Sequence, residues 1–194
     1  MVGARPEPRR FGPRRLRPSE TSPAPGTSAL RTFAVALYDR KVVQAACLAL
    51  QDVHGLDVNV VLFAAWTGAA LGRALEARDA RTADEAVAAW RERVVGPLRS
   101  VRRDMKSIAS GLAGGDALRA KVKAVELEAE LVELDALDRL GAEVGEAAAP
   151  SSELALANIR TIVTALAREP GGAEAHVAAI AAAIGSNTDI GSSA

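Results

Sequence analysis

The stretch ACLALQDVHGLDVNVVLFAAW, residues 46–66, decides how this chain folds. Its first half carries apolar residues at three- and four-residue spacing, which predicts a helix with one face toward a core. His54-Gly55 ends that helix, because glycine readily adopts the left-handed conformation that follows a helix. Asp57 then caps a second helix that is apolar on nearly every side. Such a helix belongs in the middle of a bundle, where its Asn59 needs a hydrogen-bond partner.

The rest of the chain supplies the helices that surround this centre. Apolar periodicity predicts helices over about 29–38, 40–54, 58–77, 82–109, 117–145, 152–168 and 173–184. We expect Asp39 to cap the second helix, and a capping box from Thr82 to Glu85 to begin the fourth. The expected fold is all-α, a compact helical bundle of about five to seven helices with a near-fully buried third helix.

Two of the predicted helices, 82–109 and 117–145, form a long antiparallel hairpin. The apolar stripe of the first continues through Pro97, so we expect a bend at Gly96-Pro97 rather than an end. A short glycine-rich turn then reverses the chain. We expect the second helix to face the core with a stripe made of Leu118, Val122, Val125, Ala129, Val132, Ala136 and Leu140.

Charge and proline are distributed unevenly along the chain. Residues 1–30 carry a net charge of +4, residues 31–110 of +3 and residues 111–194 of −7, although the total is zero. Six of the nine prolines lie in the first 28 residues, where apolar periodicity is missing. We expect four parts: a disordered Arg/Pro-rich tail over 1–28, a helical core domain over 29–146, a C-terminal helical pair packed on it over 150–185, and a disordered tail over 186–194.

The sequence predicts a cytoplasmic protein that does not insert into membranes. The longest apolar run, residues 58–72, is shorter than the ~20 residues that a membrane-spanning helix needs. The single cysteine, Cys47, has no partner for a disulfide within the chain and lies in an apolar stripe. We expect it to be an inert core residue.

Catalytic, cofactor and metal motifs are missing from the sequence. There is no HExxH or paired CxxC pattern, and the segment GLAGGD at 111–116 lacks the lysine of a phosphate-binding loop. The one polar site that we single out is His54 with Asp57 and Asn59. No nucleophile accompanies it, and a histidine at a helix end commonly has a structural role. We therefore expect no cofactor and no metal, and an enzymatic function is disfavoured.

A basic stripe on the hairpin has two interpretations. Arg99, Arg102, Arg103 and Lys106 share one flank of the first helix, where a nucleic-acid-binding protein would neutralise phosphates. Glu126, Glu130 and Glu133 lie on the like-handed flank of the second helix, and antiparallel pairing brings like-handed flanks together, so that Arg99 and Arg102 meet Glu126 and Glu130. The geometry favours internal ion pairs over nucleic-acid binding.

A second apolar stripe on the helix over 117–145 predicts contact with another chain. Leu127, Leu131 and Leu134 fall on the side opposite the expected core stripe, so they need a cover of their own. That cover is either the C-terminal helices or a partner. The sequence thus predicts a non-catalytic α-helical domain for protein–protein interaction or self-association. The alternative is a nucleic-acid-associated regulator that uses the basic stripe.

Three blocks of the sequence resemble a known family. The blocks are 46–66, Trp90 with VVGPLRSVRRDMK (94–106), and KVKAVELEAELVEL (121–134). In this order they are similar to an uncharacterised proteobacterial family, domain of unknown function 2390, over about residues 30–140. The resemblance implies a small, all-helical cytoplasmic bacterial protein. It implies no activity, because the family has none assigned.

Overall fold

The buried centre of the protein is helix α3 (Val58–Ala69), which Asp57 caps as predicted. The computed structural model describes residues 28–185, so the tails predicted over 1–28 and 186–194 lie almost wholly outside the described residues. Every residue of α3 from 59 to 68 is buried. The predicted all-α bundle around a near-fully buried third helix is therefore confirmed.

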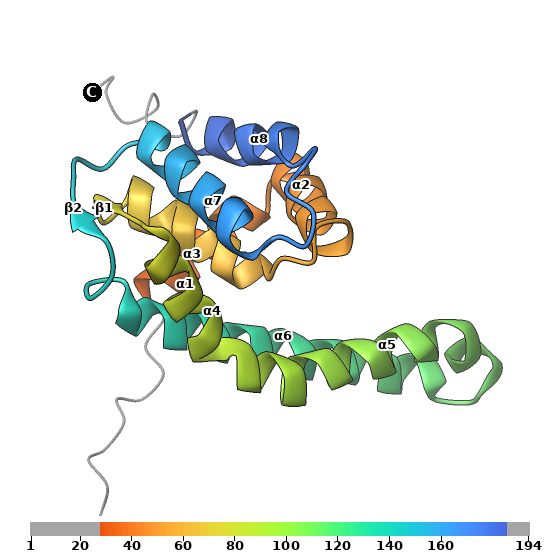
Figure 1. Cartoon of the computed structure of the whole chain (residues 1–194). Coiled ribbons are helices and arrows are strands. Elements are labelled where there is room, and N and C mark those ends of the chain that lie inside the picture. Colours follow the sequence, from red (N-terminus) through yellow and green to blue (C-terminus); the bar gives the residue numbers. More distant parts are fainter. Residues whose placement is uncertain (1–27, 186–194) are drawn as a thin grey trace, which may run out of the picture.

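Five helices form the body of the molecule together with α3 (Figure 1). They are α1 (Ala29–Tyr38), α2 (Lys41–Asp52), α4 (Ala77–Trp90), α7 (Ser152–Leu166) and α8 (Glu174–Gly185). The predicted bounds of α1 are confirmed. The predicted cap of α2 is wrong, because Arg40 occupies the N-cap position and makes no side-chain capping bond, while Asp39 ends α1.

The C-terminal helices belong to the same core as the rest. Ile159 and Ile162 of α7 and Ile180 of α8 are fully buried within the cluster that also contains Phe63 of α3. α7 lies directly against α3, and α8 packs on α2 and α7 (Figure 1). Because large apolar side chains of α7 fill the centre of the bundle, α3 cannot be fully buried without that helix.

Gly68 allows α3 and α7 to approach each other at backbone distance. A Cβ atom built on Gly68 would lie 2.5 Å from the backbone nitrogen of Ala155 and 2.6 Å from its Cα. Side-chain carbons do not tolerate such distances, so only glycine fits here.

The third helix ends earlier than predicted. It stops at Ala69 rather than near residue 77, because Gly72 takes the left-handed conformation with φ +59°. The next residues, β1 (Arg73–Ala74), pair in antiparallel fashion with β2 (Glu146–Ala147), with Arg73 opposite Ala147. This short ladder joins the α3–α4 connection to the α6–α7 connection.

A buried asparagine that the sequence did not single out holds these connections to α7. Asn158 of α7 is 1% exposed, and its Nδ2 donates to the carbonyl oxygen of Arg73 at 2.7 Å and to Oγ1 of Thr67 at 3.2 Å. Its Oδ1 accepts from the backbone N–H of Leu75 at 2.9 Å. Its polar atoms are thus all paired, as burial demands.

The hairpin starts from α4 and projects away from the body (Figure 1). The helical path runs from α4 through a π-helical turn (Arg91–Val95) into α5 (Gly96–Ile108), and returns through α6 (Gly115–Leu140). It continues past Pro97 as predicted, with the π-turn immediately before it. The predicted capping box is wrong: the N-cap of α4 is Glu76, six residues before Thr82, and Glu76 and Asp79 cap each other there.

Replacing Gly68 by alanine should destabilise the protein, because the new Cβ would separate α3 from α7. We expect a loss of about 1–3 kcal/mol in the free energy of unfolding, measured by urea denaturation. Gly111→Ala is the matched control, since its Cβ would meet no atom within 4 Å. Equal stability of the two variants would contradict the close contact as the reason for glycine.

Candidate interaction surface and adjoining pocket

One face of the α5–α6 hairpin is occupied by ion pairs between its two helices. Arg99 Nη2 lies 2.6 Å from Glu130 Oε1, and Arg99 Nε lies 3.4 Å from Glu126 Oε1. Arg102 contacts both carboxylate oxygens of Glu126 through Nε and Nη2. The predicted internal pairing of Arg99 and Arg102 is confirmed. We call these four residues the ionic face of the hairpin.

Burial makes the ionic face stronger than an ordinary surface pair. Glu126 is 5% exposed. Burial opposes its ionisation, but the hydrogen bonds and charges of Arg102 and Arg99 outweigh that effect and lower its pKa. The other two residues of the basic stripe differ: Arg103 reaches Asp52 only at 3.7 Å, with both side chains 59% exposed, and Lys106 is exposed. The stripe is therefore not one continuous cationic surface.

The opposite face of the hairpin is apolar and exposed. The two helices of the hairpin form a layer with two faces. The ionic residues of both helices lie on one face, so the residues on the opposite flank of each helix lie together on the second face. Five large apolar residues there are between 48% and 60% exposed: Val101, Ile108, Leu118, Val125 and Val132. We call them the apolar face. The prediction that Leu118, Val125 and Val132 turn toward the core is wrong.

Trp90 lies where the hairpin joins the body. Its indole Nε1 donates to the carbonyl oxygen of Ala129 at 2.9 Å, and 39% of the residue is exposed. This bond ties the end of α4 to α6 at a residue that lies between Val125 and Val132 in the sequence. An aromatic side chain held by one hydrogen bond offers large contact area with little loss of side-chain entropy on binding.

The three leucines predicted to contact a partner do not share one environment. Leu134 is 4% exposed and belongs to the core, Leu131 is half-buried against that core, and Leu127 is 54% exposed. Only Leu127 of the three has a largely exposed side chain. The reason is that Ala129, Leu134 and Leu137 are the apolar residues of α6 that are buried. This buried side of the helix is rotated around the helix axis from the predicted core stripe.

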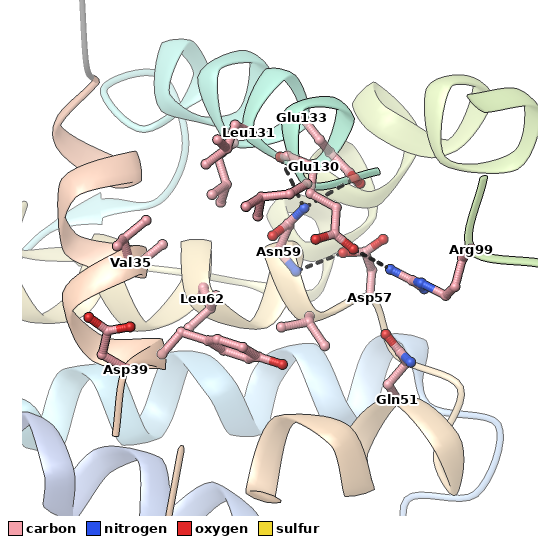
Figure 2. A pocket seen from close by; sticks show the side chains of 15 residues that line it. Val35, Asp39, Gln51, Asp57, Asn59, Leu62, Arg99, Glu130, Leu131 and Glu133 are labelled. Carbon is pink, nitrogen blue, oxygen red and sulfur yellow. Dashed lines mark hydrogen bonds and ion pairs between the residues drawn. The ribbon is translucent and has the colours of Figure 1, made fainter. Parts of the chain in front are cut away.

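A pocket of about 290 Å³ lies at the root of the hairpin, between α6, α1 and the start of α3. Figure 2 shows Val35, Leu62 and Leu131 toward one end and Asn59, Glu130 and Glu133 toward the other. Two of the three residues of the predicted polar site, Asp57 and Asn59, line this pocket. The body and the hairpin, which we also call the arm, therefore both contribute residues to this cavity.

Asp57 has a structural role at the polar end of the pocket. Its Oδ1 accepts from the backbone N–H groups of Asn59 at 2.7 Å and Val60 at 3.4 Å, which caps α3. Its Oδ2 pairs with Arg91 at 3.3 Å, and Arg91 also pairs with Asp84 at 2.7 Å. The charge of Asp57 is thus balanced by Arg91 and by the N-terminus of α3.

Asn59 and Glu133 form the deepest part of the polar end. Asn59 Nδ2 donates to Glu133 Oε2 at 3.1 Å and to the carbonyl oxygen of Glu130 at 3.3 Å, which supplies the partner that Asn59 was expected to need. Glu133 is 2% exposed, and its Oε1 has no hydrogen-bond partner within residues 28–185. Burial, followed by the charge of Asp57, raises the pKa of Glu133 to about 8. A neutral carboxylic acid therefore predominates at this site at neutral pH.

His54 lies outside the pocket and has structural contacts. It is 3% exposed, its Nδ1 donates to the carbonyl oxygen of Glu169, and its own carbonyl oxygen accepts from the N–H of Arg168. These bonds hold the end of α2 to the α7–α8 connection. Cys47 is fully buried, and burial raises the pKa of its thiol to about 12, so it is inert as expected.

Sequence reasoning placed Glu130 and Glu133 on the flank that faces the basic stripe, and assigned neither of them nor Tyr38 to a pocket. The sequence does not distinguish Glu133 from its acidic neighbours, because α6 alternates acidic and apolar residues over 126–134. One signal was present. A buried Asn59 demands a partner, and an acidic residue on the helix that packs there is able to accept its hydrogen bond.

The ionic face should show coupling in a double-mutant cycle. Arg102→Glu alone places like charges together, whereas Arg102→Glu with Glu126→Arg restores the pair. We expect a coupling free energy of about 1–3 kcal/mol from urea denaturation, because Glu126 is buried. Arg103→Glu is the control and should change stability by less than about 0.5 kcal/mol. Additive effects of the two substitutions would show that the pair does not stabilise the hairpin.

Glu133 should make the protein less stable as pH rises. A carboxyl whose pKa is higher in the folded state binds its proton more tightly there, so its contribution is complete below 4.5, its ordinary pKa, and is lost as pH passes about 8. We expect Glu133→Gln to remove this loss, so that the variant gains stability relative to the original protein between pH 5 and 9 in urea titrations.

Glu128→Gln is the control for the pH titration, since Glu128 is exposed on the same helix. The stability difference between this variant and the original protein should stay flat over that range. A flat difference for Glu133→Gln as well would mean that Glu133 is ionised in the folded protein.

Comparison with known proteins gives one result. The model of a family described as "Protein of unknown function (DUF2390)" matches residues 29–137, whereas no curated protein and no solved structure matches the chain. The matched residues begin with α1 and end within α6, so they include all of α5, α6 up to residue 137, and every residue that lines the pocket. Since more than half of the 194 residues match, the chain belongs to the DUF2390 family of proteins of unknown function.

Proposed function

We propose that this protein is a non-catalytic interaction domain that self-associates through the apolar face of its projecting hairpin. The observation that supports it most is the pair of unlike faces on one arm: ion pairs on one side, and five large apolar residues about half exposed on the other. α5 has no buried residue at all. An isolated two-helix arm gains stability when a second layer covers its apolar side.

A second copy of the chain fits this face. Two hairpins stacked through their apolar faces form a four-helix arrangement, and a twofold axis lets the same patch serve both partners. The stripe from Leu118 to Val132 is about 21 Å long and two helices wide, a footprint of roughly 400 Å². This is small for a stable dimer, so we expect association that depends on concentration.

The nucleic-acid alternative has less support. Arg99 and Arg102 are held against Glu126 and Glu130, and these carboxylates would repel phosphates that approach the same face. The described helices include none long and apolar enough to span a bilayer.

Val125→Asp should weaken self-association by roughly tenfold or more, because it places a charge in the centre of the buried face. Ile108→Asp, on the other helix, should do the same. The measurement is sedimentation equilibrium of the full chain over a range of concentrations. Ala120→Asp is the matched control, since Ala120 is exposed and lies about 140° around α6 from Val125.

Two outcomes would contradict this proposal. The first is a chain that is monomeric over its whole soluble range. The second is a dimer that survives Val125→Asp and Ile108→Asp but is lost with Leu127→Asp, which would assign the interface to the leucine side of α6.

A further inference from the structure

We propose that the pocket at the root of the hairpin binds a small primary ammonium ion that carries an apolar group. The proposal rests on three features of the same cavity: an unpaired buried carboxylate oxygen, an excess of acidic side chains, and an apolar end. It is independent of self-association, because none of the five residues of the apolar face lines the pocket.

The unpaired oxygen is the first feature. Glu133 Oε1 has no hydrogen-bond partner among the described residues although the residue is 2% exposed, whereas its other oxygen is held by Asn59 at 3.1 Å. Leaving such a group buried and unpaired costs about 1–3 kcal/mol. When Glu133 is ionised, a donor on a bound molecule would remove that cost. Asn59 also fixes the orientation of the carboxyl group, so the free oxygen has a defined position.

The charge of the lining favours a cationic donor. Asp39, Asp57, Glu130 and Glu133 line the pocket together with one base, Arg99, whose guanidinium is already bound to Glu130 at 2.6 Å. Arg91 does not line the pocket, and its guanidinium pairs with Asp57 at 3.3 Å and with Asp84 at 2.7 Å. The lining keeps a negative balance even when Glu133 is protonated. A carboxylate or phosphate ligand would be repelled, whereas an ammonium ion would be attracted.

The cation that we infer is molecular. Within residues 28–185, no three His, Cys, Asp or Glu side chains are arranged to hold a metal ion. An ammonium group instead needs only a few acceptors and leaves the rest of the molecule free for apolar contact. Val35, Leu62 and Leu131 supply that contact at the other end (Figure 2). The volume of about 290 Å³ limits the ligand to a small molecule.

Binding should be linked to the protonation of Glu133. The charged or titratable groups around it are Tyr38, Asp39, Asp57, Arg91, Arg99 and Glu130. With Glu133 mostly protonated at neutral pH, an ammonium ion that pairs with it must displace its proton. Affinity should therefore rise about tenfold between pH 6 and 7 and level off above pH 8.

The experiment is isothermal titration calorimetry of the full chain with n-butylammonium, n-butanol and butyrate. These probes share one apolar group and differ in the charge and hydrogen bonding of the other end. We expect n-butylammonium to bind at least tenfold more tightly than n-butanol, and butyrate more weakly still. Titration at pH 7 in two buffers with different ionisation enthalpies should show release of close to one proton per ammonium ion bound.

Glu133→Gln separates the role of the carboxylate from that of the apolar end. The variant should lose the proton release and at least tenfold in n-butylammonium affinity, while n-butanol binding stays unchanged. Glu128→Gln is the control and should behave like the original protein. Circular dichroism confirms that each variant is folded, and the proton count on the unaltered chain needs no variant.

Three results would overturn the proposal. The first is no binding of n-butylammonium, and the second is equal affinity for n-butylammonium and n-butanol. The third is n-butylammonium binding that releases no proton and is unchanged by Glu133→Gln. Sedimentation of the same samples reports on self-association separately. A failed pocket and a failed dimer are therefore distinguishable.

Discussion

The contact between the backbones of α3 and α7 at Gly68 is the constraint on which the rest of the structure depends. It lets α3 be covered at close range, so that residues 59–68 are all buried. The same approach brings Asn158 to the carbonyl of Arg73 and the N–H of Leu75, which positions the β-ladder and the start of α4. Since α4 continues into the hairpin, the direction of the arm follows from a helix–helix contact at the opposite side of the body.

The family match and the physical unit do not coincide. The matched residues end at 137, inside α6, yet α7 fills the centre of the core with Ile159 and Ile162. A chain cut after α6 would expose one whole side of α3 to water. Exposure of that much apolar surface would cost more free energy than a marginally stable domain can lose, so such a fragment should not fold as this structure does. The residues beyond the match are therefore part of the domain.

At the root of the hairpin, buried polar side chains make contacts at which the apolar periodicity of the sequence predicts apolar packing. Glu126 and Glu133 are buried, while Val125 and Val132 are exposed. Buried ionisable groups contribute little net stability, but they strongly favour the one arrangement that pairs them. We infer that the ionic face mainly sets how the two helices of the arm lie against each other, and that their apolar residues remain available to a partner.

Much of the fold could be predicted from sequence because the decisive signals are local. Asp57 before an apolar helix, His54-Gly55 at a helix end, and the bases of α5 opposite the acids of α6 each give one structural answer. The side of α6 that faces the core could not be predicted, because apolar residues recur at helical spacing on both of its flanks. Which flank is buried depends on Asn59, Arg99 and Arg102, partners that lie far away in the chain.

The candidate site was only partly predictable for the same reason. Asp57 and Asn59 were singled out by their place at the start of a buried helix, and both line the pocket. Glu133 becomes distinctive only when α6 packs over α3 and removes water from its carboxyl group. His54 belonged to the same candidate site in sequence, but its hydrogen-bond partner comes from the α7–α8 connection, more than a hundred residues later in the chain.

The π-helical turn at Arg91–Val95 determines how the orientation of α5 depends on the number of residues that precede it. A π-turn accommodates one more residue than the α-helix it interrupts, and each residue rotates the following side chains by about 100°. Loss of that residue would restore a regular helix and leave the orientation of α5 unchanged. With the present number of residues, a regular α-helix in place of the π-turn would instead rotate all of α5 by about 100°. Arg99 and Arg102 would then leave Glu126 and Glu130, and Val101 would turn toward a different side. The π-turn between Trp90 and Pro97 therefore sets which chemical surface the hairpin presents.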